Sequence, residues 1–460
     1  MTDEPLVSDS ITDTIVAIST PPGRGGIGIV RLSGPLASGL AVQLVRLRHP
    51  LEHARARLAD VVADSAPDAE RIDEALVTYF AAPHSYTSED LVEIAAHGSP
   101  VVLELLVRRA IELGARLAEP GEFTQRAFLS GRLDLTQAEA VRDLIDAQTL
   151  TQARQAASQL GGALSHRVTP IKHSLVELVA LLEAGIDFAE DDLDVTPQDE
   201  IAHRIDLLLP PLAALEASFA HGRVIHDGLT LAIVGRPNAG KSSLFNRLVE
   251  RDRAIVTATP GTTRDLVTER ISLSGIPLEL VDTAGLREGR EEAEQLGIAR
   301  SREAMADAQI VLVVLDGTER LNDEERQLLE LVDARPAIVV LNKSDLAGAG
   351  ALADGFPATA LRTSALTGEG IEELRARILE LATGGAAAEP GMLTNLRQHQ
   401  AIEASLAGLR DAAQANQSCI PHEMILLDLY RALWALDSLT GQTTPDDILN
   451  LIFSTFCIGK

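Results

Sequence analysis

The stretch LTLAIVGRPNAGKS, residues 229–242, carries the strongest structural signal in the chain. Its first part, Leu229–Val234, is a short apolar run typical of a buried strand, and GRPNAGKS then matches the phosphate-binding pattern G-x-x-x-x-G-K-[ST]. In such a loop the glycines let backbone amides face phosphates, Lys241 reaches the β and γ oxygens, and the Ser242 hydroxyl can ligate Mg²⁺. The stretch predicts a P-loop nucleoside triphosphate domain.

Further motifs follow in the order that such a domain requires, namely PGTTRD from Pro260, DTAG from Asp282, NKSD from Asn342 and SAL from Ser364. A threonine of PGTTRD, either Thr262 or Thr263, can supply a second Mg²⁺ ligand. Asp282 can hold the metal through water, and the Gly285 amide can sense the γ-phosphate. The order of these motifs favours a nucleotide hydrolase over a chance match to the loop pattern.

The NKSD motif predicts which base the bound nucleotide carries. The Asp345 carboxylate can accept two hydrogen bonds from the edge of guanine, whereas adenine would leave that charge unpaired at a cost of roughly 1 to 3 kcal/mol. We therefore expect a GTPase rather than an ATPase.

The residue after DTAG is Leu286, where Ras-type enzymes place a glutamine that orients the attacking water. Catalysis must then use another device. The candidates are a carboxylate in Arg287–Glu294, REGREEAE, and a cation beside the phosphates that replaces an arginine finger. For any single member of this acidic run, a solvated helix position is the alternative interpretation.

Hydrophobic patterning divides the chain into four segments. Residues 1–130 mix β-like runs with glycine turns and one apolar helix near Val101–Leu113, which indicates an α+β domain. Residues 131–223 and 389–460 have helical spacing. Residues 224–388 alternate amphipathic helices with short apolar runs, which predicts a parallel sheet covered by helices on both faces. The runs are Leu229–Val234, Leu278–Val281, Ile310–Leu315 and Ala337–Leu341. The economical arrangement is a Ras-like α/β domain inserted into a helical one.

Composition excludes several functions. With 40 Lys+Arg against 67 Asp+Glu, the net charge is −27, so nonspecific binding of phosphate backbones is not the main activity. Aromatic residues make up only 3%, which argues against a base-stacking surface. Two cysteines, an acidic start and the lack of a long apolar run predict a cytoplasmic protein without a disulfide framework or membrane span.

One glycine pattern matches a dinucleotide-binding motif, but its surroundings do not fit such a site. Gly23, Gly25 and Gly28 fit the G-x-G-x-x-G of dinucleotide sites, but the β-like run IVRLSGP follows them instead of a helix. We expect a connection between strands, whose glycines also allow a ligand to approach the backbone.

With these motifs the whole chain resembles the MnmE (TrmE) family of tRNA-modification GTPases. The resemblance is carried by TIVAISTPPGRGGIGIVRLSG from Thr14, HSYTSEDLVEIAAHG from His84, PGEFTQRAFLSGRLDLTQAEAV from Pro120, EAGIDFAEDDLD from Glu183, the GTPase motifs and the terminal FCIGK. It implies a folate-binding-like N-terminal domain that also dimerises, and a helical domain interrupted by the GTPase domain.

The resemblance implies how the missing glutamine is replaced. K⁺ would be held by Asn238, the carbonyls of Thr257 and Thr259, and Thr262 as the GTPase domains of a homodimer pair, while Mg²⁺ would be held by Ser242 and Thr263. Glu294 would orient the attacking water through a bridging water, with Lys241 and Gly285 completing the catalytic set. The implied GTP-binding residues are Asn238, Ala239, Gly240, Lys241, Ser242, Ser243, Thr257, Ala258, Thr259, Pro260, Gly261, Thr262, Thr263, Asp282, Thr283, Ala284, Gly285, Asn342, Lys343, Asp345, Ser364, Ala365 and Leu366.

A second implied site binds 5,10-methylenetetrahydrofolate, with 5-formyltetrahydrofolate as a bound analogue. Arg31, Glu93 and Lys460 match its contacts, and Arg132 stands where relatives carry a lysine; its charge is kept, but a planar fork is not a point charge. Cys457 is either a thiol packed against a helix or a reactive one.

The family's reaction is expected to need a partner. With the FAD protein MnmG (GidA), in a heterotetramer, the chain would install an aminomethyl or carboxymethylaminomethyl group at C5 of the wobble uridine, position 34, of certain tRNAs, with FAD and NADH belonging to the partner. Two alternatives stay open: a regulatory switch GTPase of ribosome assembly or stress response, and a folate enzyme that acts alone.

Overall fold

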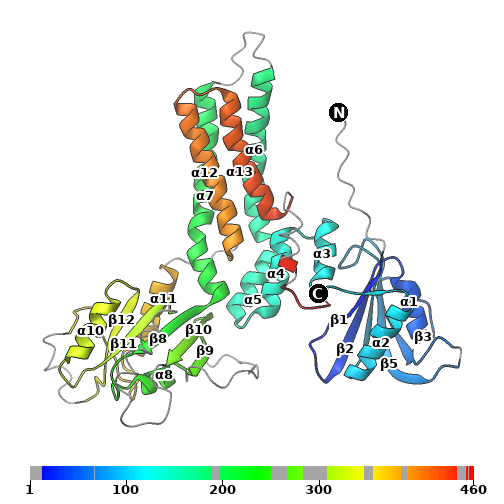
Figure 1. Cartoon of the computed structure of the whole chain (residues 1–460), viewed down its shortest axis with the longest axis horizontal. Coiled ribbons are helices and arrows are strands. Elements are labelled where there is room, and N and C mark those ends of the chain that lie inside the picture. Colours follow the sequence, from blue (N-terminus) through cyan, green and yellow to red (C-terminus); the bar gives the residue numbers. More distant parts are fainter. Residues whose placement is uncertain are drawn as a thin grey trace. The chain divides into compact units, whose positions relative to one another are not determined.

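A computed structural model describes residues 13–66, 68–187, 197–249, 267–282, 308–346, 356–384, 391–442, 452–453 and 455–459 (Figure 1). The chain forms two compact units. Unit 1 comprises Met1–Arg142 with Asp437–Lys460, and unit 2 comprises Asp143–Leu436. Within the described ranges, no helix combines the length and the apolarity that crossing a bilayer requires.

Unit 1 is built on a seven-stranded sheet in the order β3-β4-β5-β6-β2-β1-β7. The strands are β1 Ile15–Ile18, β2 Gly25–Ser33, β3 Val45–Leu47, β4 Arg55–Val62, β5 Arg71–Phe80, β6 Leu91–Gly98 and β7 Arg116–Leu117. β1 and β2 pair antiparallel, so the glycine-rich stretch connects two strands, as the sequence predicted. The second strand begins earlier than the run IVRLSGP and includes the glycines from Gly25 on. The helices of this unit are α1 Ala37–Leu44, α2 Pro100–Glu112, α3 Glu122–Leu129 and α4 Leu135–Asp146, which runs into unit 2.

The sheet of unit 1 is covered unequally. Alternate residues such as Val61 and Val77 are buried against the side of α1 and α2, because successive strand residues point to opposite faces. On the other face α3 covers β1 through Phe123, which packs with Ala17. Farther along that face the cross-strand neighbours Leu58 and Leu76 are about half exposed, at 48% and 50%.

The C-terminal residues of the chain return to the N-terminal sheet of unit 1. The Ser19 hydroxyl donates to the Gly459 carbonyl at 2.9 Å, and Ile458 forms an isolated bridge with Pro120. Phe453 and Phe456 pack with Leu135 of α4. The terminal Cys-Ile-Gly segment is therefore held beside the end of β1 and the start of α3.

Unit 2 contains long helices and a second sheet. Its helices are α5 Leu150–Leu160, α6 Ala163–Asp187, α7 Gln198–Asp227, α12 Leu396–Gln417 and α13 His422–Thr440, which extends into unit 1. α12 and α6 both pack along α7 (Figure 1). The chain leaves these helices after α7 and returns to them at α12, so the sheet is inserted into the helical part.

The inserted sheet has the order β13-β12-β11-β8-β10-β9. Its strands are β8 Leu229–Val234, β9 Val267–Leu273, β10 Ile276–Asp282, β11 Ile310–Asp316, β12 Ala337–Asn342 and β13 Leu361–Arg362, and its helices are α8 Lys241–Val249, α10 Asp323–Val332 and α11 Ile371–Thr383. α8 and α11 share one apolar core with the sheet and α10 contributes to the core on the other face. The predicted α/β fold is confirmed, with one addition: β9 pairs antiparallel with β10 at the edge.

Candidate functional site

The loop between β8 and α8 contains two glycines at positions where a Cβ atom would clash with neighbouring atoms. Gly235 has φ 147°, and a Cβ there would lie 2.2 Å from the Val314 carbonyl oxygen. Gly240 has φ 91°, and a Cβ there would lie 2.2 Å from the side-chain nitrogen of Asn342. Asn238 adopts φ 65°, a left-handed conformation that asparagine tolerates. The glycines thus let the loop turn tightly at the carboxyl end of β8, which is where a phosphate group fits at the start of a helix.

Lys241 is the first residue of α8 and its side chain folds back over this loop. Its Nζ donates to the Gly235 and Arg236 carbonyls, at 2.8 Å each, and the residue is only 7% exposed. A lysine held there adds a fixed positive charge to the positive end of the helix dipole. Ser242 and Ser243 follow it on the exposed side. This geometry fits the predicted contact of Lys241 with the phosphates of a nucleotide.

A second loop system joins the first through Asn342, the last residue of β12. Its side-chain nitrogen donates to the Ala239 carbonyl at 3.0 Å, and its side-chain oxygen accepts from the Ala365 amide at 3.2 Å. Three residues on, the exposed Asp345 carboxylate accepts from the buried Ser364 hydroxyl at 2.6 Å. The structure therefore brings the predicted phosphate loop together with the residues that are predicted to bind guanine. Leu366, beside them, is 80% exposed.

Asp316, at the carboxyl end of β11, belongs to the same site, although it was not among the predicted site residues. It is 5% exposed, and Lys343 Nζ lies 2.7 Å from its carboxylate. Burial alone would raise the pKa of Asp316, but hydrogen bonds from Lys343 and Thr318 hold that pKa below its ordinary value. Arg236 of the phosphate loop lies 3.8 Å away. The signal was an aspartate that ends an apolar strand, VLVVLD.

Of the other residues predicted to bind the nucleotide, the structure describes Asp282 but not the rest. Asp282 ends β10 and is the register partner of Ile233 in β8, so its backbone lies at the same edge of the sheet as the phosphate loop. The remaining ones lie outside the described residues, and so does Lys460; these are Thr257, Ala258, Thr259, Pro260, Gly261, Thr262, Thr263, Thr283, Ala284, Gly285 and Glu294.

A separate cluster forms in unit 1 around the predicted folate residues. Arg31 and Glu93 are register partners on β2 and β6 and form an ion pair of 2.7 Å. The Arg31 guanidinium lies 5.6 Å from the centres of the Tyr86 and Phe123 rings, within cation–π range. Arg132 lies 5.7 Å from the Tyr86 ring. Arg31 and Arg132 therefore both lie close to Tyr86, which was not among the predicted site residues, and Glu93 joins them through its ion pair with Arg31.

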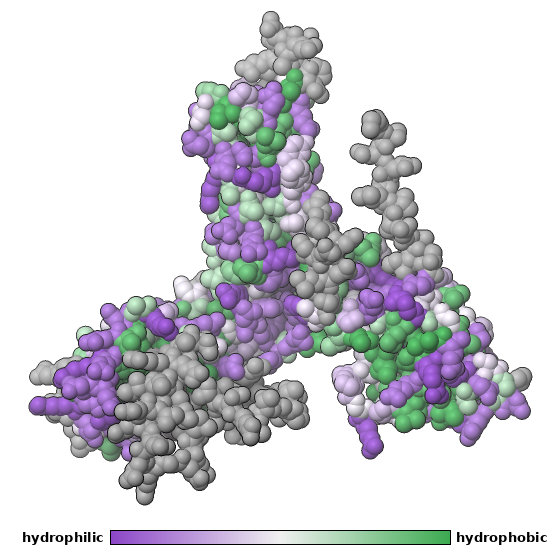
Figure 2. Space-filling view, viewed as in Figure 1, coloured by the Kyte–Doolittle hydropathy of each residue, from purple (hydrophilic) through white to green (hydrophobic). Residues whose placement is uncertain are grey.

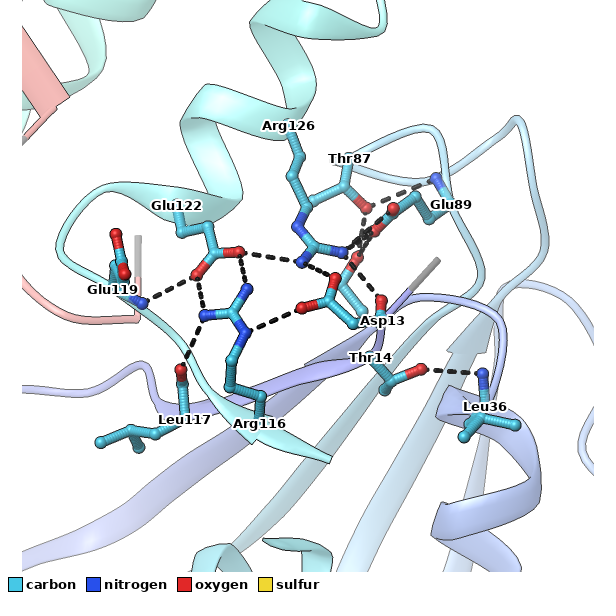
Figure 3. A network of polar contacts seen from close by, with 11 residues as sticks. Asp13, Thr14, Leu36, Thr87, Glu89, Arg116, Leu117, Glu119, Glu122 and Arg126 are labelled. Atoms are coloured by element: carbon cyan, nitrogen blue, oxygen red, sulfur yellow. Dashed lines mark hydrogen bonds and ion pairs between the residues drawn. The ribbon is translucent and has the colours of Figure 1, made fainter. Parts of the chain in front are cut away.

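An ion network holds the walls of this cluster in place (Figure 3). Arg126 of α3, whose side chain is 2% exposed, contacts the carboxylates of Asp13, Glu89 and Glu122 at 2.8 to 3.1 Å. Arg116 of β7 forms two further hydrogen bonds with Glu122, at 2.6 and 3.1 Å. Burial alone would raise the pKa of Glu122, but hydrogen bonds to Arg116, the Glu119 amide and Arg126 keep that pKa low. The network links α3, which carries Phe123, to the loop that carries Tyr86.

The two cysteines, Cys419 and Cys457, are both free and both exposed. A thiol packed against a helix was one interpretation of Cys457, and its exposure contradicts that interpretation. Its carbonyl accepts from the Gly121 amide at 3.4 Å, so the residue stands beside the start of α3. An exposed thiol is accessible to reactants, which agrees with the other interpretation.

Comparisons with known proteins cover nearly all of the chain. The family model described as "MnmE helical domain" matches residues 135–457, and the one described as "GTP-binding protein TrmE N-terminus" matches residues 14–132. A protein of Koribacter versatilis named "tRNA modification GTPase MnmE" is 59% identical over 98% of this chain and 100% of that protein. Proteins of the same name from Symbiobacterium thermophilum and Thiobacillus denitrificans are 43% and 42% identical, over 97% of this chain and 99% and 98% of theirs.

The matches extend through both units and include the inserted sheet, the helices around it and the N-terminal sheet. They agree with the order of motifs in the sequence and with the phosphate loop and guanine residues that the fold brings together. The chain belongs to the MnmE family of tRNA modification GTPases.

Proposed function

We propose that the chain hydrolyses GTP in a K⁺-stimulated reaction and, with the FAD protein MnmG, modifies C5 of the wobble uridine of certain tRNAs with a one-carbon unit from tetrahydrofolate. The observation that carries the proposal is the presence of two separate sites in one chain: the phosphate loop joined to the guanine residues by Asn342, and the arginine cluster around Tyr86. The curated relatives are named for tRNA modification and for GTP hydrolysis.

At the nucleotide site the phosphates would lie against the backbone amides of the loop that ends at Lys241, with Ser242 and Thr263 as the Mg²⁺ ligands. Asp345 would accept the two hydrogen bonds of the guanine edge, because its carboxylate has about four acceptor sites and Ser364 uses one of them. Mg²⁺ supplies charge neutralisation when it is bound. Lys241, which is already held over the loop, would place a positive charge at the β and γ oxygens.

For hydrolysis we propose that K⁺ takes the place of an arginine finger. Asn238 supports this, because it is exposed at the rim of the loop and its side-chain oxygen is a ligand of the kind that alkali cations take. The partners proposed for it are the backbone carbonyls of Thr257 and Thr259 and the side chain of Thr262. Glu294 would orient the attacking water, in the place that Leu286 leaves without a polar group.

The folate site would use Arg31, Glu93, Arg132 and Lys460. The ion pair of Arg31 and Glu93 is about one quarter exposed on each side, so both groups can still meet a ligand. A carboxylate can accept the N–H groups of a pterin ring, and the arginines suit the carboxylates of the glutamate tail. Gly459, the residue before Lys460, is held beside Ser19 by a hydrogen bond, which supports a role for Lys460 in this unit. Cys457, exposed near the start of α3, is the proposed reactive thiol.

We propose that unit 1 also forms a homodimer, and that two chains join MnmG in a heterotetramer. The exposed leucines of β4 and β5 support the dimer because they leave an apolar strip on an otherwise regular sheet face. Figure 2 shows that hydrophobic residues also gather over the part of unit 1 that faces the viewer. A net charge of −27 supports a partner that carries most of the tRNA contact. The finer division into segments 1–130, 131–223, 224–388 and 389–460 remains a prediction.

The first test is steady-state GTP hydrolysis in KCl and in NaCl at equal ionic strength, for the wild type and for Asn238→Ala. The expected result is a strong K⁺ preference that the variant loses. The matched control is Asn395→Ala, which removes an asparagine at the start of α12, in the helical part of unit 2 and outside the inserted sheet, and should keep the K⁺ preference. Equal wild-type rates in both salts would contradict the K⁺ mechanism.

The second test separates the modification enzyme from a switch GTPase of ribosome assembly or stress response. The wild type should bind 5-formyltetrahydrofolate, Arg31→Ala should not, and MnmG should be required for modified uridine to form in tRNA. A chain that hydrolyses GTP but neither binds the folate nor supports modification would favour the switch.

A further inference from the structure

The hairpin β9–β10 lies between the two predicted nucleotide loops in the chain. The PGTTRD motif precedes Val267, and DTAG begins at Asp282, the last residue of β10. The strands pair in continuous register from Val267 opposite Asp282 to Leu273 opposite Ile276, which makes the hairpin one stiff element. Its turn, at the far end from the nucleotide motifs, consists of Ser274 and Gly275 with φ 51° and 89°.

The start of α5 holds this turn. The Thr149 hydroxyl donates to the Gly275 carbonyl at 2.7 Å. The same hydroxyl oxygen accepts from the Gln152 amide at 3.1 Å, so Thr149 is also the N-cap of the helix. A Cβ on Gly275 would lie 1.9 Å from the Thr151 hydroxyl, which shows how closely the turn and the helix approach each other.

The end of α7 also contacts the first turn of α5 and the β9–β10 hairpin. The Gln152 side-chain nitrogen donates to the His226 carbonyl at 2.8 Å. Gly228, between α7 and β8, lies so close to the hairpin that a Cβ added to it would be 2.8 Å from the Pro277 carbonyl oxygen. α5 is thus bonded at its first turn both to the tip of the hairpin and to the helix that enters the sheet. These contacts all lie within unit 2.

We propose that Thr149 is a positioning residue that latches the tip of the β9–β10 hairpin to the helices, so that a change of nucleotide state is transmitted to the helical part of the chain. The inference rests on the proposed function and specifies where its GTPase cycle is coupled to modification. A stiff hairpin held at its tip cannot shift at its nucleotide end without moving α5 or breaking the latch.

The latch can be separated from the helix cap by the choice of substitution. Thr149→Asp keeps a good N-cap acceptor for the Gln152 amide, but a carboxylate has no hydrogen to donate to the Gly275 carbonyl. Thr149→Ser keeps both interactions and is the matched control. Any difference between the two variants therefore reports the bond to the hairpin and not the stability of α5.

The experiment measures GTP hydrolysis and modified uridine in the same reaction, with the full chain, MnmG and tRNA. For Thr149→Asp we expect hydrolysis within about twofold of wild type, and a fall of about fivefold or more in modification per GTP hydrolysed, the factor that one hydrogen bond supplies. Thr149→Ser should behave as wild type. Equal coupling in the Asp variant would overturn the latch, whereas a wild type that forms no modified uridine would overturn the proposed function.

A measurement on the wild type alone covers the case in which Thr149→Asp does not fold. Hydrogen–deuterium exchange is compared between the GDP state and a state with a non-hydrolysable GTP analogue. The peptides that contain the hairpin turn and the first turn of α5 should change their protection together. A change at the hairpin without any change at α5 would contradict the proposal.

Discussion

Replacing Asp143 with asparagine should lower the pKa of His226 by more than one unit. His226 Nε2 lies 3.1 Å from the Asp143 carboxylate and Nδ1 lies 2.8 Å from that of Asp227. Asp143 is the largest cause of a pKa raised from 6.5 to about 9, with burial opposing it and Asp227 adding to it. Asparagine has the same shape but no charge. Because Asp227 remains, the pKa should fall to between about 6.5 and 8.

This pKa has a definite consequence for stability. One pKa unit corresponds to 1.36 kcal/mol, so the interactions of the protonated ring contribute about 3 kcal/mol. Since the pKa is raised in the folded chain, that contribution is fully present below pH 6.5 and is lost as the pH rises toward about 9. The end of α7, where the chain enters the inserted sheet, should therefore open more readily at alkaline pH.

The assay is an NMR titration of the histidine ring signals, with His226→Gln used to identify the resonance among the 11 histidines. Asp227→Asn is the control and should lower the pKa less, because its carboxylate is half exposed, at 47%. A wild-type pKa near 6.5, or a pKa that Asp143→Asn leaves unchanged, would refute the reasoning.

Three further predictions concern packing and ion pairs. Gly222→Ala places a Cβ 2.0 Å from the Leu393 carbonyl oxygen and should destabilise the helices of unit 2 by about 2 kcal/mol or more in thermal unfolding, whereas Gly39→Ala, on an open side of α1, should be neutral or slightly stabilising. Arg126→Met removes the buried cation of the unit 1 network and should cost about 3 kcal/mol; an unchanged unfolding curve would show that the carboxylates do not need it. Because the pKa of Glu122 is lowered, the stability it provides is present above pH 4.5 and should disappear as the pH falls further, which acid unfolding followed by circular dichroism will test.

Local sequence was sufficient to predict the central parallel strands of the inserted sheet. The runs Leu229–Val234, Ile310–Leu315 and Ala337–Leu341 correspond to β8, β11 and β12 within one residue, because a strand covered on both faces reads as a continuous apolar run. The edge strand β9 gave no such run, and it is also the one that pairs antiparallel. Asn342 reaches the phosphate loop because β12 and β8 are parallel and end at the same edge of the sheet.

Contacts between distant parts of the chain could not be predicted in the same way. Tyr86 and Phe123 flank Arg31 because α3 and a loop cover the same strand, and neither carries a local signal for that approach. Thr149 resembles any N-cap residue in the sequence, and its bond to Gly275 spans 126 positions. Such pairings depend on how elements stack, which periodicity does not encode.

The two connections of the inserted sheet also emerge side by side. Leu393 lies where the chain returns from the inserted sheet to the helices, and its amide donates to the Ser218 hydroxyl of α7 at 3.2 Å. The preceding residue, Met392, packs with Ile225, which lies near the end of α7. Removing the whole GTPase domain thus requires joining two points that already touch. Both covalent connections of the GTPase domain therefore lie at one place on the helical part, which is the arrangement expected of a domain inserted into a loop of another domain.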